Sequence, residues 1–255
     1  MPINYARRLT GSHRTPSTDR HLGFTLAFVA GAINAGGFLA VRQYTSHMTG
    51  IVSAMADSLA VGTYELALAG AAALLSFVAG AMCTAILVNF GRRRASQSVF
   101  ALPLLLEAAL LLLFGVVGAS LSNVIGLFVP FTVMLLCFIM GLQNALVTKI
   151  SRAEIRTTHI TGIVTDIGIE LGKLVYWSRA ADKPGVVADR GRLQLLCKLA
   201  VSFFLGGVAG ALGFKHAGYL ATVPLAIVLI ALAIVAPLDD VMSSIRRRLA
   251  SQRRS

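Results

Sequence analysis

The sequence predicts an all-α integral membrane protein with six transmembrane helices and two short helices that re-enter the bilayer or lie at its interface. Hydrophobic residues make up 56% of the 255 residues and charged residues only 13%, whereas about 25% of residues are charged in an ordinary soluble domain. The mean hydropathy is +0.76. Long apolar runs alternate with short basic clusters, which excludes a disordered chain, a fibre and a nucleic-acid module with basic residues spread over a folded face.

Six apolar runs are long enough to cross the membrane, because a hydrocarbon core about 30 Å thick requires roughly 20 apolar helical residues. They are Leu22 to Val41, Leu66 to Val88, Phe100 to Ala119, Val124 to Thr148, Leu193 to Phe214 and Gly218 to Leu238. We expect them to form a single transmembrane domain over residues 22–240. A disordered tail is expected at 1–21 and a basic tail at 241–255, both in the cytoplasm.

The basic residues predict the orientation, because cytoplasmic loops retain Lys and Arg. Six crossings gather most of the 23 basic residues on one side, in the two tails, around Arg93 and between Lys149 and Arg192. Arg42 and Lys215 fall on the other side. The sequence therefore predicts that the N and C termini are both cytoplasmic.

Two further apolar segments, Ile51 to Val61 and Gly162 to Leu174, are too short to cross. At 1.5 Å per residue they reach roughly 17 to 20 Å, which suits a re-entrant or interfacial helix. The alternative is that both do cross, which gives eight helices and parallel repeats. That arrangement places Arg93 outside, against the charge rule.

The two halves of the chain repeat one pattern. Segments 45–51 and 157–163 agree at five of seven positions and share a His-x-Thr-Gly motif, written HxTG below. In the run before each motif, Asn34 recurs as Asn144 with the same Gly and Ala neighbours. Each half, about 22–121 and 124–238, would hold three crossings. Since three is odd, the halves enter the bilayer from opposite sides, as in transporters with inverted 3+3 repeats.

Four motifs carry a resemblance to a known family: GFLA at 37–40, SHMTG at 46–50, GLQNA at 141–145 and RTTHITGIVTDIG at 156–168. Together they resemble the YoaK-type family of bacterial inner-membrane proteins, a domain of unknown function, over about residues 22 to 240. The resemblance implies a multi-helix protein in the bacterial plasma membrane and supplies no substrate. Where the family pattern leads us to expect Asn after the first HxTG motif, the chain has Ile51, so no role rests on a polar side chain there.

Polar groups at bilayer depth are costly unless they are paired or hydrated, so they are candidates for function. We expect a solute to bind where the two HxTG motifs approach each other. Thr49 and Thr161 suit the N-caps of the short helices, which would leave free N–H groups at Gly50 and Gly162 facing the solute. The candidate solute-binding residues are His47, Thr49, Gly50, His159, Thr161, Gly162, Asn34 and Asn144.

Other interpretations of these residues stay open. Both short helices can lie at the interface with their polar side chains in water, the histidines merely closing a turn. Asn34 and Asn144, with Gln143, can instead form hydrogen bonds between helices. If the motifs do form a site, histidines beside two helix starts make a mainly positive locus, which favours an anionic or hydrogen-bond-accepting solute.

Four acidic residues are candidates for proton or ion coupling: Asp57, Asp166, Glu170 and Glu107. Asp57 continues a stripe with Thr49 and Ser53 at i, i+4, i+8 spacing, and Asp166 shares a helix face with Glu170. Glu107 lies inside the third apolar run without a cation nearby in the sequence. It must therefore be neutral, paired across helices or exposed to water.

These features predict a secondary transporter of a small solute, because the sequence contains no nucleotide-binding motif that would power a pump. The alternatives are a scaffold or regulatory membrane protein and, less favoured, a membrane-embedded hydrolase built from the histidines and aspartates. No catalytic motif is found, so we expect no enzyme, no cofactor and no metal. The expected partners are the bilayer and a small solute, with no nucleic acid. The oligomeric state is left open, a homo-oligomer included.

Overall fold

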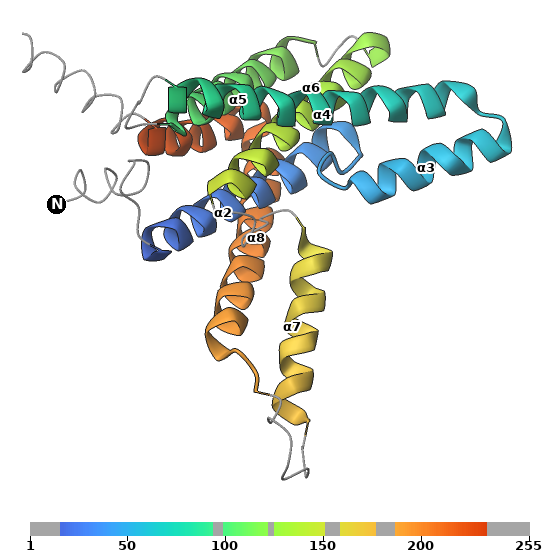
Figure 1. The fold of residues 1–255 in the computed structure, drawn as a ribbon. Helices are drawn as coiled ribbons and strands as arrows, with labels where there is room; N and C mark the ends of the chain where they lie inside the picture. The colour runs from blue at the N-terminus through green and yellow to red at the C-terminus, as the bar shows by residue number, and fades with distance from the viewer. Residues whose placement is uncertain (1–15, 94–98, 122–124, 151–158, 177–186, 234–255) are drawn as a thin grey trace, which may run out of the picture.

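The computed structural model describes residues 16–93, 99–121, 125–150, 159–176 and 187–233, which contain helices and no strand (Figure 1). The elements are α2 (Pro16–Val41), α3 (Met48–Val61), α4 (Tyr64–Arg93), α5 (Ala101–Leu121), α6 (Ile125–Ile150), α7 (Ile160–Val175), α8 (Arg190–Ala217) and the 3-10 turn η1 (Gly218–Ala221). A further helix occupies residues 222–233. The prediction of an all-α protein is confirmed.

The apolar helices make the chain a multi-pass membrane protein. Within the described residues, five stretches are long and apolar enough to cross a bilayer: Arg20–Val41, Tyr64–Arg93, Ala101–Ser120, Pro130–Ile150 and Arg190–Ala233. The first four correspond to the first four predicted runs. The fifth contains the fifth run and most of the sixth, divided at Gly218, where a φ of 56° turns the chain after α8. The predicted end of the sixth run at Leu238 lies outside the described residues.

The helix boundaries differ from the apolar runs at a few ends. The helix α2 begins at Pro16, six residues before the expected start at Leu22, so its first residues lie within the predicted tail. Proline is favoured in a first helical turn, where its missing N–H has no partner to lose. Residues 1–15 and the predicted basic tail at 241–255 lie outside the described residues. The two short helices are 14 and 16 residues long, each three residues longer than its predicted apolar segment.

The long helices pack across the two halves of the chain. The largest helix pairs are α2 with α8 and α4 with α6, so each pair joins one helix from each half. Small residues let membrane helices approach closely. At five glycines an added Cβ would collide with a backbone carbonyl of the facing helix: Gly31 with Phe203, Gly206 with Phe28 and Gly210 with Ala32 between α2 and α8, and Gly141 with Phe77 and Gly80 with Phe138 between α4 and α6. In both helix pairs, α2 with α8 and α4 with α6, glycines of each helix therefore pack against backbone carbonyls of the other.

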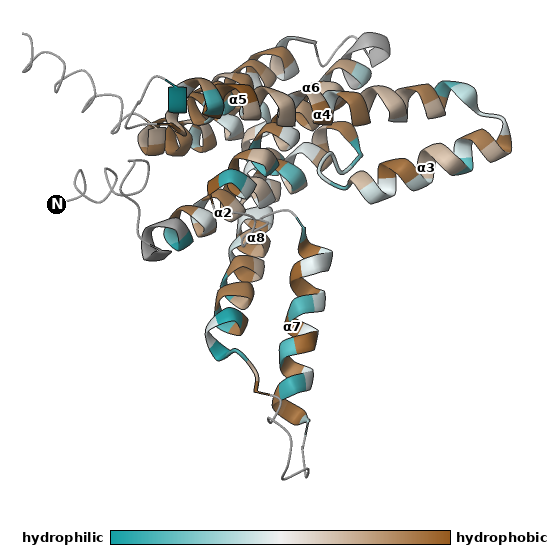
Figure 2. Ribbon diagram, in the orientation of Figure 1, coloured by the Kyte–Doolittle hydropathy of each residue, from teal (hydrophilic) through white to brown (hydrophobic). Residues whose placement is uncertain are grey.

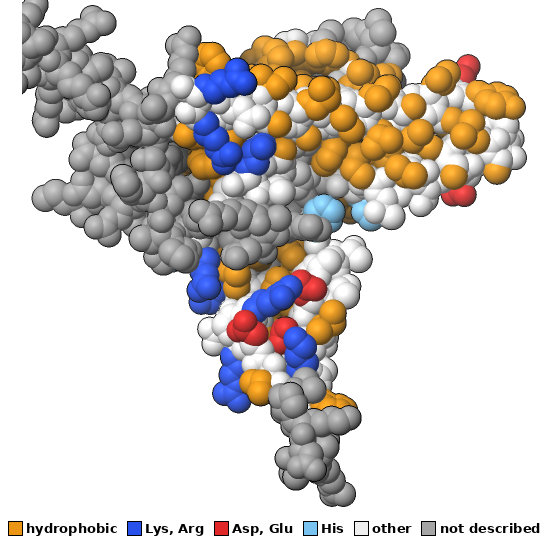
Figure 3. Space-filling view, in the orientation of Figure 1, with side chains coloured by type: hydrophobic (Ala, Val, Ile, Leu, Met, Phe, Trp, Pro, Cys, Tyr) orange, Lys and Arg blue, Asp and Glu red, His pale blue; other side chains and the backbone are white. Residues whose placement is uncertain are grey.

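Two helical hairpins project from this core (Figure 1). We call residues 48–75 of α3 and α4 the first arm, and residues 160–201 of α7 and α8 the second arm. Figure 2 shows the first arm mostly hydrophobic, and Figure 3 shows Lys, Arg, Asp and Glu gathered on the second. The first arm exposes large apolar side chains, including Leu59, Val61, Leu66, Leu68 and Leu75. The arms thus share a form and differ in surface chemistry.

Candidate functional site

A cavity of about 640 Å³ lies where the two short helices begin. We call it the central cavity. It is lined by residues of both halves, Asn34, Tyr44, Ser46, His47, Met48, Thr49, Phe77, Asn144, His159, Ile160, Thr161 and Phe203. Six of the eight predicted solute-binding residues are among them. The exceptions, Gly50 and Gly162, line two flanking pockets instead.

The expected N-caps of the short helices are wrong. Each helix begins one residue after its histidine, so His47 and His159 are the N-cap residues, and neither makes a side-chain capping hydrogen bond. Thr49 and Thr161 lie in the first turn, where a hydroxyl is not placed to accept from the N–H groups one or two residues ahead. The first backbone bonds run from Ile51 N to His47 O, 3.1 Å, and from Ile163 N to His159 O, 3.0 Å. The preceding N–H groups therefore lack a capping side chain, so both helix starts present donors and a positive dipole end.

The two histidines are oriented differently. The ring of His47 lies over its own helix start, because an added Cβ on Gly50 would collide with the ring carbon Cδ2 and stand 2.9 Å from Nε2. At Gly162 an added Cβ would meet only the His159 Cβ, at 4.0 Å, which is ordinary contact. The His47 ring thus occupies the space beside Gly50 and would have to move for a larger residue, whereas Gly162 places no such limit on His159.

Hydrogen bonds hold the wall of the central cavity in place. The Asn34 Oδ1 accepts from the Ser46 hydroxyl at 2.8 Å and from the Ser46 N–H at 3.4 Å, which ties the loop before the first HxTG motif to α2. Gln143 Nε2 donates to the Leu26 carbonyl at 3.3 Å, from α6 to α2. Gln143 therefore bonds between helices, and Asn34 both anchors a loop and lines the cavity.

Three aromatic residues of the site were missed by the sequence reasoning, and one is Tyr44 in the loop after α2. Phe77 from α4 and Phe203 from α8 line the central cavity, one from each half. Both belong to a repeated Ser-Phe-x-x-Gly segment, at 76–80 and 202–206, whose glycine makes the close helix crossing. In the first copy the Ser76 hydroxyl donates to the Met134 carbonyl of α6 at 2.7 Å. A search of α4 and α8 for this repeat would have found both rings.

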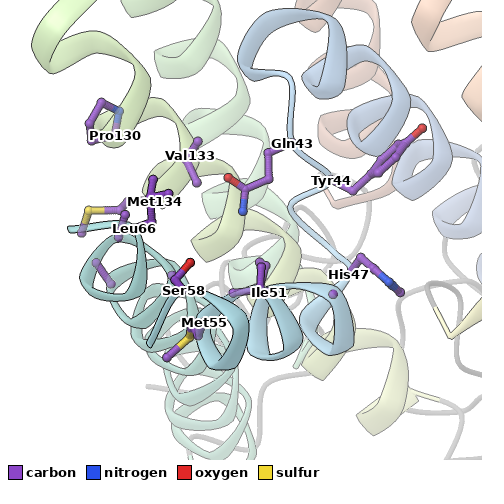
Figure 4. A pocket seen from close by; sticks show the side chains of 15 residues that line it. Gln43, Tyr44, His47, Ile51, Met55, Ser58, Leu66, Pro130, Val133 and Met134 are labelled. Atoms are coloured by element: carbon purple, nitrogen blue, oxygen red, sulfur yellow. The ribbon is translucent and has the colours of Figure 1, made fainter. Parts of the chain in front are cut away.

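A first flanking pocket of about 520 Å³ lies between α3, α4 and α6 (Figure 4). Its wall is mainly apolar. Its lining residues are Gln43, Tyr44, His47, Gly50, Ile51, Ala54, Met55, Ser58, Leu66, Ala69, Gly70, Ala72, Pro130, Val133 and Met134. The pocket therefore meets the central cavity at His47 and Tyr44, which line both.

A second flanking pocket of about 620 Å³ lies between the start of α2, α7 and α8. Its lining residues are Arg20, His159, Gly162, Ile163, Asp166, Asp189, Gly191, Arg192, Leu195, Leu196 and Leu199. An ion pair crosses it, because Arg192 Nη2 donates to Asp166 Oδ2 at 2.9 Å and so joins α8 to α7. His159 lines both this pocket and the central cavity.

The flanking pockets use equivalent positions of the two halves. The motif offset that relates His47 to His159 also relates Ala54 of the first pocket to Asp166 of the second. The offset between the two Ser-Phe-x-x-Gly segments relates Leu66 to Arg192. The ion pair thus stands where the first pocket has two apolar side chains.

The four predicted coupling residues are not gathered at one place. Asp166 borders the second pocket, whereas Asp57 is exposed on α3 and lines none of the three cavities. Glu170 is buried in the second arm: the Lys173 ammonium donates to it at 2.8 Å and the Asp189 N–H at 2.8 Å. These bonds, that from Lys173 first, lower the pKa of the Glu170 carboxyl below its ordinary value. Across the described residues, no three His, Cys, Asp or Glu side chains cluster closely enough to hold a metal ion.

Glu107 is fully buried in α5. Neither of its carboxyl oxygens has a hydrogen-bond partner among the residues that the structure describes. An unpaired carboxylate in an apolar interior is very costly. Of the three states expected for this residue, the neutral one fits this environment.

Comparisons with known proteins identify the family. No curated protein and no solved structure matches the chain. One family model, described as "Protein of unknown function (DUF1275)", matches residues 22–235. This range covers most of the chain and agrees with the YoaK-type resemblance carried by the motifs, which is confirmed. The chain therefore belongs to this family of unknown function.

Proposed function

We propose that the protein is a secondary transporter that binds a small solute in the central cavity. One observation carries the proposal: the HxTG motifs, from different halves of the chain, line one cavity together with Asn34 and Asn144, the two asparagines of the repeat. A scaffold has no need for such a shared polar cavity among membrane-spanning helices, where polar groups are costly.

The proposed architecture is an inverted repeat with six crossings. Helices α2 and α6 are equivalent, and the residues after α2, Gln43 and Tyr44, line the same pocket as Pro130 near the start of α6. The two helices therefore approach this pocket with opposite ends, which supports opposite orientations of the halves. The stretch Arg190–Ala233 has 44 residues, about 66 Å of helix, twice the bilayer core. Its division at Gly218 supports two crossings.

The proposed orientation follows from charge. Arg92 and Arg93 end α4, and the second arm carries Arg190, Arg192 and Lys198. Retention of these residues on one side of the bacterial inner membrane puts the outer end of the second arm and both termini on the cytoplasmic side.

The lining of the cavity indicates the class of solute. Among the described residues that line it, none is Lys, Arg, Asp or Glu; it offers carboxamides, hydroxyls, imidazoles and two phenyl rings. Two helix starts without capping side chains add N–H donors from α3 and α7. This arrangement favours an anionic or hydrogen-bond-accepting solute over a cation.

Coupling to a proton or ion gradient falls to groups outside the cavity. Asp166 is the proposed coupling residue closest to the site, because it borders the second pocket together with His159. Glu107 is a proposed proton carrier, since it is buried without a hydrogen-bond partner among the described residues. Asp57 and Glu170 remain weaker proposals, one on an exposed face and the other held in an ion pair.

The test compares intact cells and then vesicles. Untargeted metabolite profiles of deletion and overexpression strains identify anions whose distribution changes, and their flux is measured in membrane vesicles. His47→Ala and His159→Ala are expected to abolish that flux at unchanged expression. His216→Ala is the matched control, since His216 is exposed at the end of α8 and lines none of the three cavities. Normal flux in the double histidine variant would refute the site.

A further inference from the structure

The three cavities are arranged in a row along the spanning helices. On α4 the first pocket takes residues between Leu66 and Ala72, and the central cavity takes Phe77. On α8 the second pocket takes residues between Gly191 and Leu199, and the central cavity takes Phe203. Each flanking pocket thus lies toward the N-terminal end of a long helix whose later turns border the central cavity.

The flanking pockets also lie at opposite ends of α2. Arg20 lines the second pocket, whereas Gln43, just beyond the end of the helix, lines the first. The apolar stretch Arg20–Val41 has 22 residues, about 33 Å of helix, which matches the thickness of the hydrocarbon core. The first and second pockets therefore face opposite sides of the membrane.

One histidine stands at each junction. His47 lines the first pocket and the central cavity, and His159 lines the second pocket and the central cavity. Figure 4 shows the His47 side chain at the edge of the first pocket. A side chain that borders two adjoining spaces is part of the wall between them, so its displacement joins the spaces.

We propose that the flanking pockets are the two access routes to the central cavity, with His47 and His159 as the partitions. The Asp166–Arg192 ion pair is a latch on the second route, because it joins α7 to α8 across that pocket. The first route has Ala54 and Leu66 at the equivalent positions, so it lacks this ion pair. This inference rests on the proposed transport function and names the residues that open and close each route in turn during transport.

The latch is tested by cysteine accessibility, which requires no knowledge of the solute. Cys83, Cys137 and Cys197 are replaced by Ala, and Thr49→Cys then reports from the central cavity. Vesicles of both orientations are treated with a membrane-impermeant methanethiosulfonate. Because an exposed ion pair holds a geometry only weakly, Asp166→Asn or Arg192→Gln is expected to raise labelling from the second-pocket side up to about fivefold. Labelling from the other side stays unchanged.

Two variants separate the latch from a general loss of structure. The exchange Asp166→Arg with Arg192→Asp restores the ion pair and the slow labelling. Lys173→Gln breaks an ion pair that lies within α7 alone, so it leaves labelling of the reporter unchanged. Equal labelling in the exchange variant and the single variants would overturn the latch.

The partitions are tested with a reporter cysteine in the other half of the chain, so that each histidine substitution does not alter a residue next to the reporter. His159→Ala is expected to raise labelling of Thr49→Cys from the second-pocket side only. His47→Ala is expected to raise labelling of Thr161→Cys from the first-pocket side only. Equal increases from both sides would overturn the two routes. Sided labelling without flux in any vesicle assay would leave the routes in place and refute transport.

Discussion

The first and second arms occupy equivalent places in the two halves, and their surfaces differ sharply. The first arm exposes leucines and valines, whereas the second arm carries two ion pairs, Arg192–Asp166 and Lys173–Glu170 (Figure 3). Apolar side chains are stable against lipid tails, and ion pairs are stable in water or at the interface. The comparison teaches that the packing of glycines and carbonyls sets the shared form, while the outer residues set the environment of each arm.

The largest expected effect is on the close helix packing that the two halves share. Gly31→Leu and Gly141→Leu should each prevent stable folding, because the side chain would enter the backbone of Phe203 or Phe77 in the facing helix. Overpacking a dense interior usually costs 1 to 3 kcal/mol, and a backbone contact that cannot move puts the cost at about 3 kcal/mol or more. The measurement is the thermal stability of detergent-purified protein.

The matched control for both glycines is Gly168→Leu. An added Cβ at Gly168 on α7 meets nothing within 4 Å, so the same substitution should leave the melting temperature nearly unchanged. A severe loss of stability in one of Gly31→Leu and Gly141→Leu, with little loss in the other, would show that the two helix pairs are not equivalent.

The difference in environment between the two arms is tested at the equivalent positions Ala54 and Asp166, where each residue is replaced by the type found in the other arm. Ala54→Asp places a carboxylate on the apolar first arm and is expected to cost about 2.5 to 3.5 kcal/mol if the arm lies within the bilayer. Asp166→Ala removes one partner of an exposed ion pair and is expected to cost less than about 1 kcal/mol. Membrane yield and thermal stability measure both. Similar small costs would mean that the first arm lies in water.

Much of this frame could be predicted from the sequence. Apolar runs located the spanning helices and the short ones, and the repeat placed Asn34, His47, Asn144 and His159 together before any coordinates were considered. The helices could be predicted because hydropathy is a local property of a chain, and the repeat could be found by comparing the two halves of the sequence. Asn34, His47, Asn144 and His159 line the central cavity and belong to the clearest repeat in the sequence.

The remaining features depend on contacts that a local pattern does not contain. Hydropathy shows that α2 and α8 are apolar, but only the fit of Gly31 against Phe203 decides that they pack together. The start of each short helix likewise depends on where the preceding loop brings the chain back to the helix bundle. His47 is therefore the N-cap residue in place of the expected Thr49. Glu107 shows the same limit, because three states fitted its sequence and its burial distinguished them.

The two HxTG motifs offer a finer test of equivalence. Gly50→Ala should displace the His47 ring, and we expect a several-fold loss of flux, equivalent to about 1 kcal/mol, as the ring leaves the junction of two cavities. Gly162→Ala meets only ordinary contact at the His159 Cβ and gains helix propensity, so it should be neutral or slightly stabilising. Flux and thermal stability are measured for both. Equal losses would show that the two histidines are held alike.

The smallest expected effect concerns acid and the Glu170 carboxyl of the second arm. The pKa of Glu170 is lowered by its hydrogen bonds from Lys173 and from the Asp189 N–H. A carboxyl with a lowered pKa stabilises the folded state above its ordinary value of about 4.3, and this contribution is lost as the pH falls through the folded pKa. Glu170→Gln should therefore be less stable than the wild type near neutral pH.

That difference should shrink as the pH falls below about 4, because the wild-type carboxyl then becomes protonated and neutral like the amide. The equivalent position of the first arm is Ser58, which does not titrate, and Ser58→Ala provides the control. Its difference from the wild type should be the same at every pH at which the protein stays folded. Melting temperatures in detergent across this range measure both variants. A constant difference for Glu170→Gln would mean that the carboxylate does not stabilise the second arm through its charge.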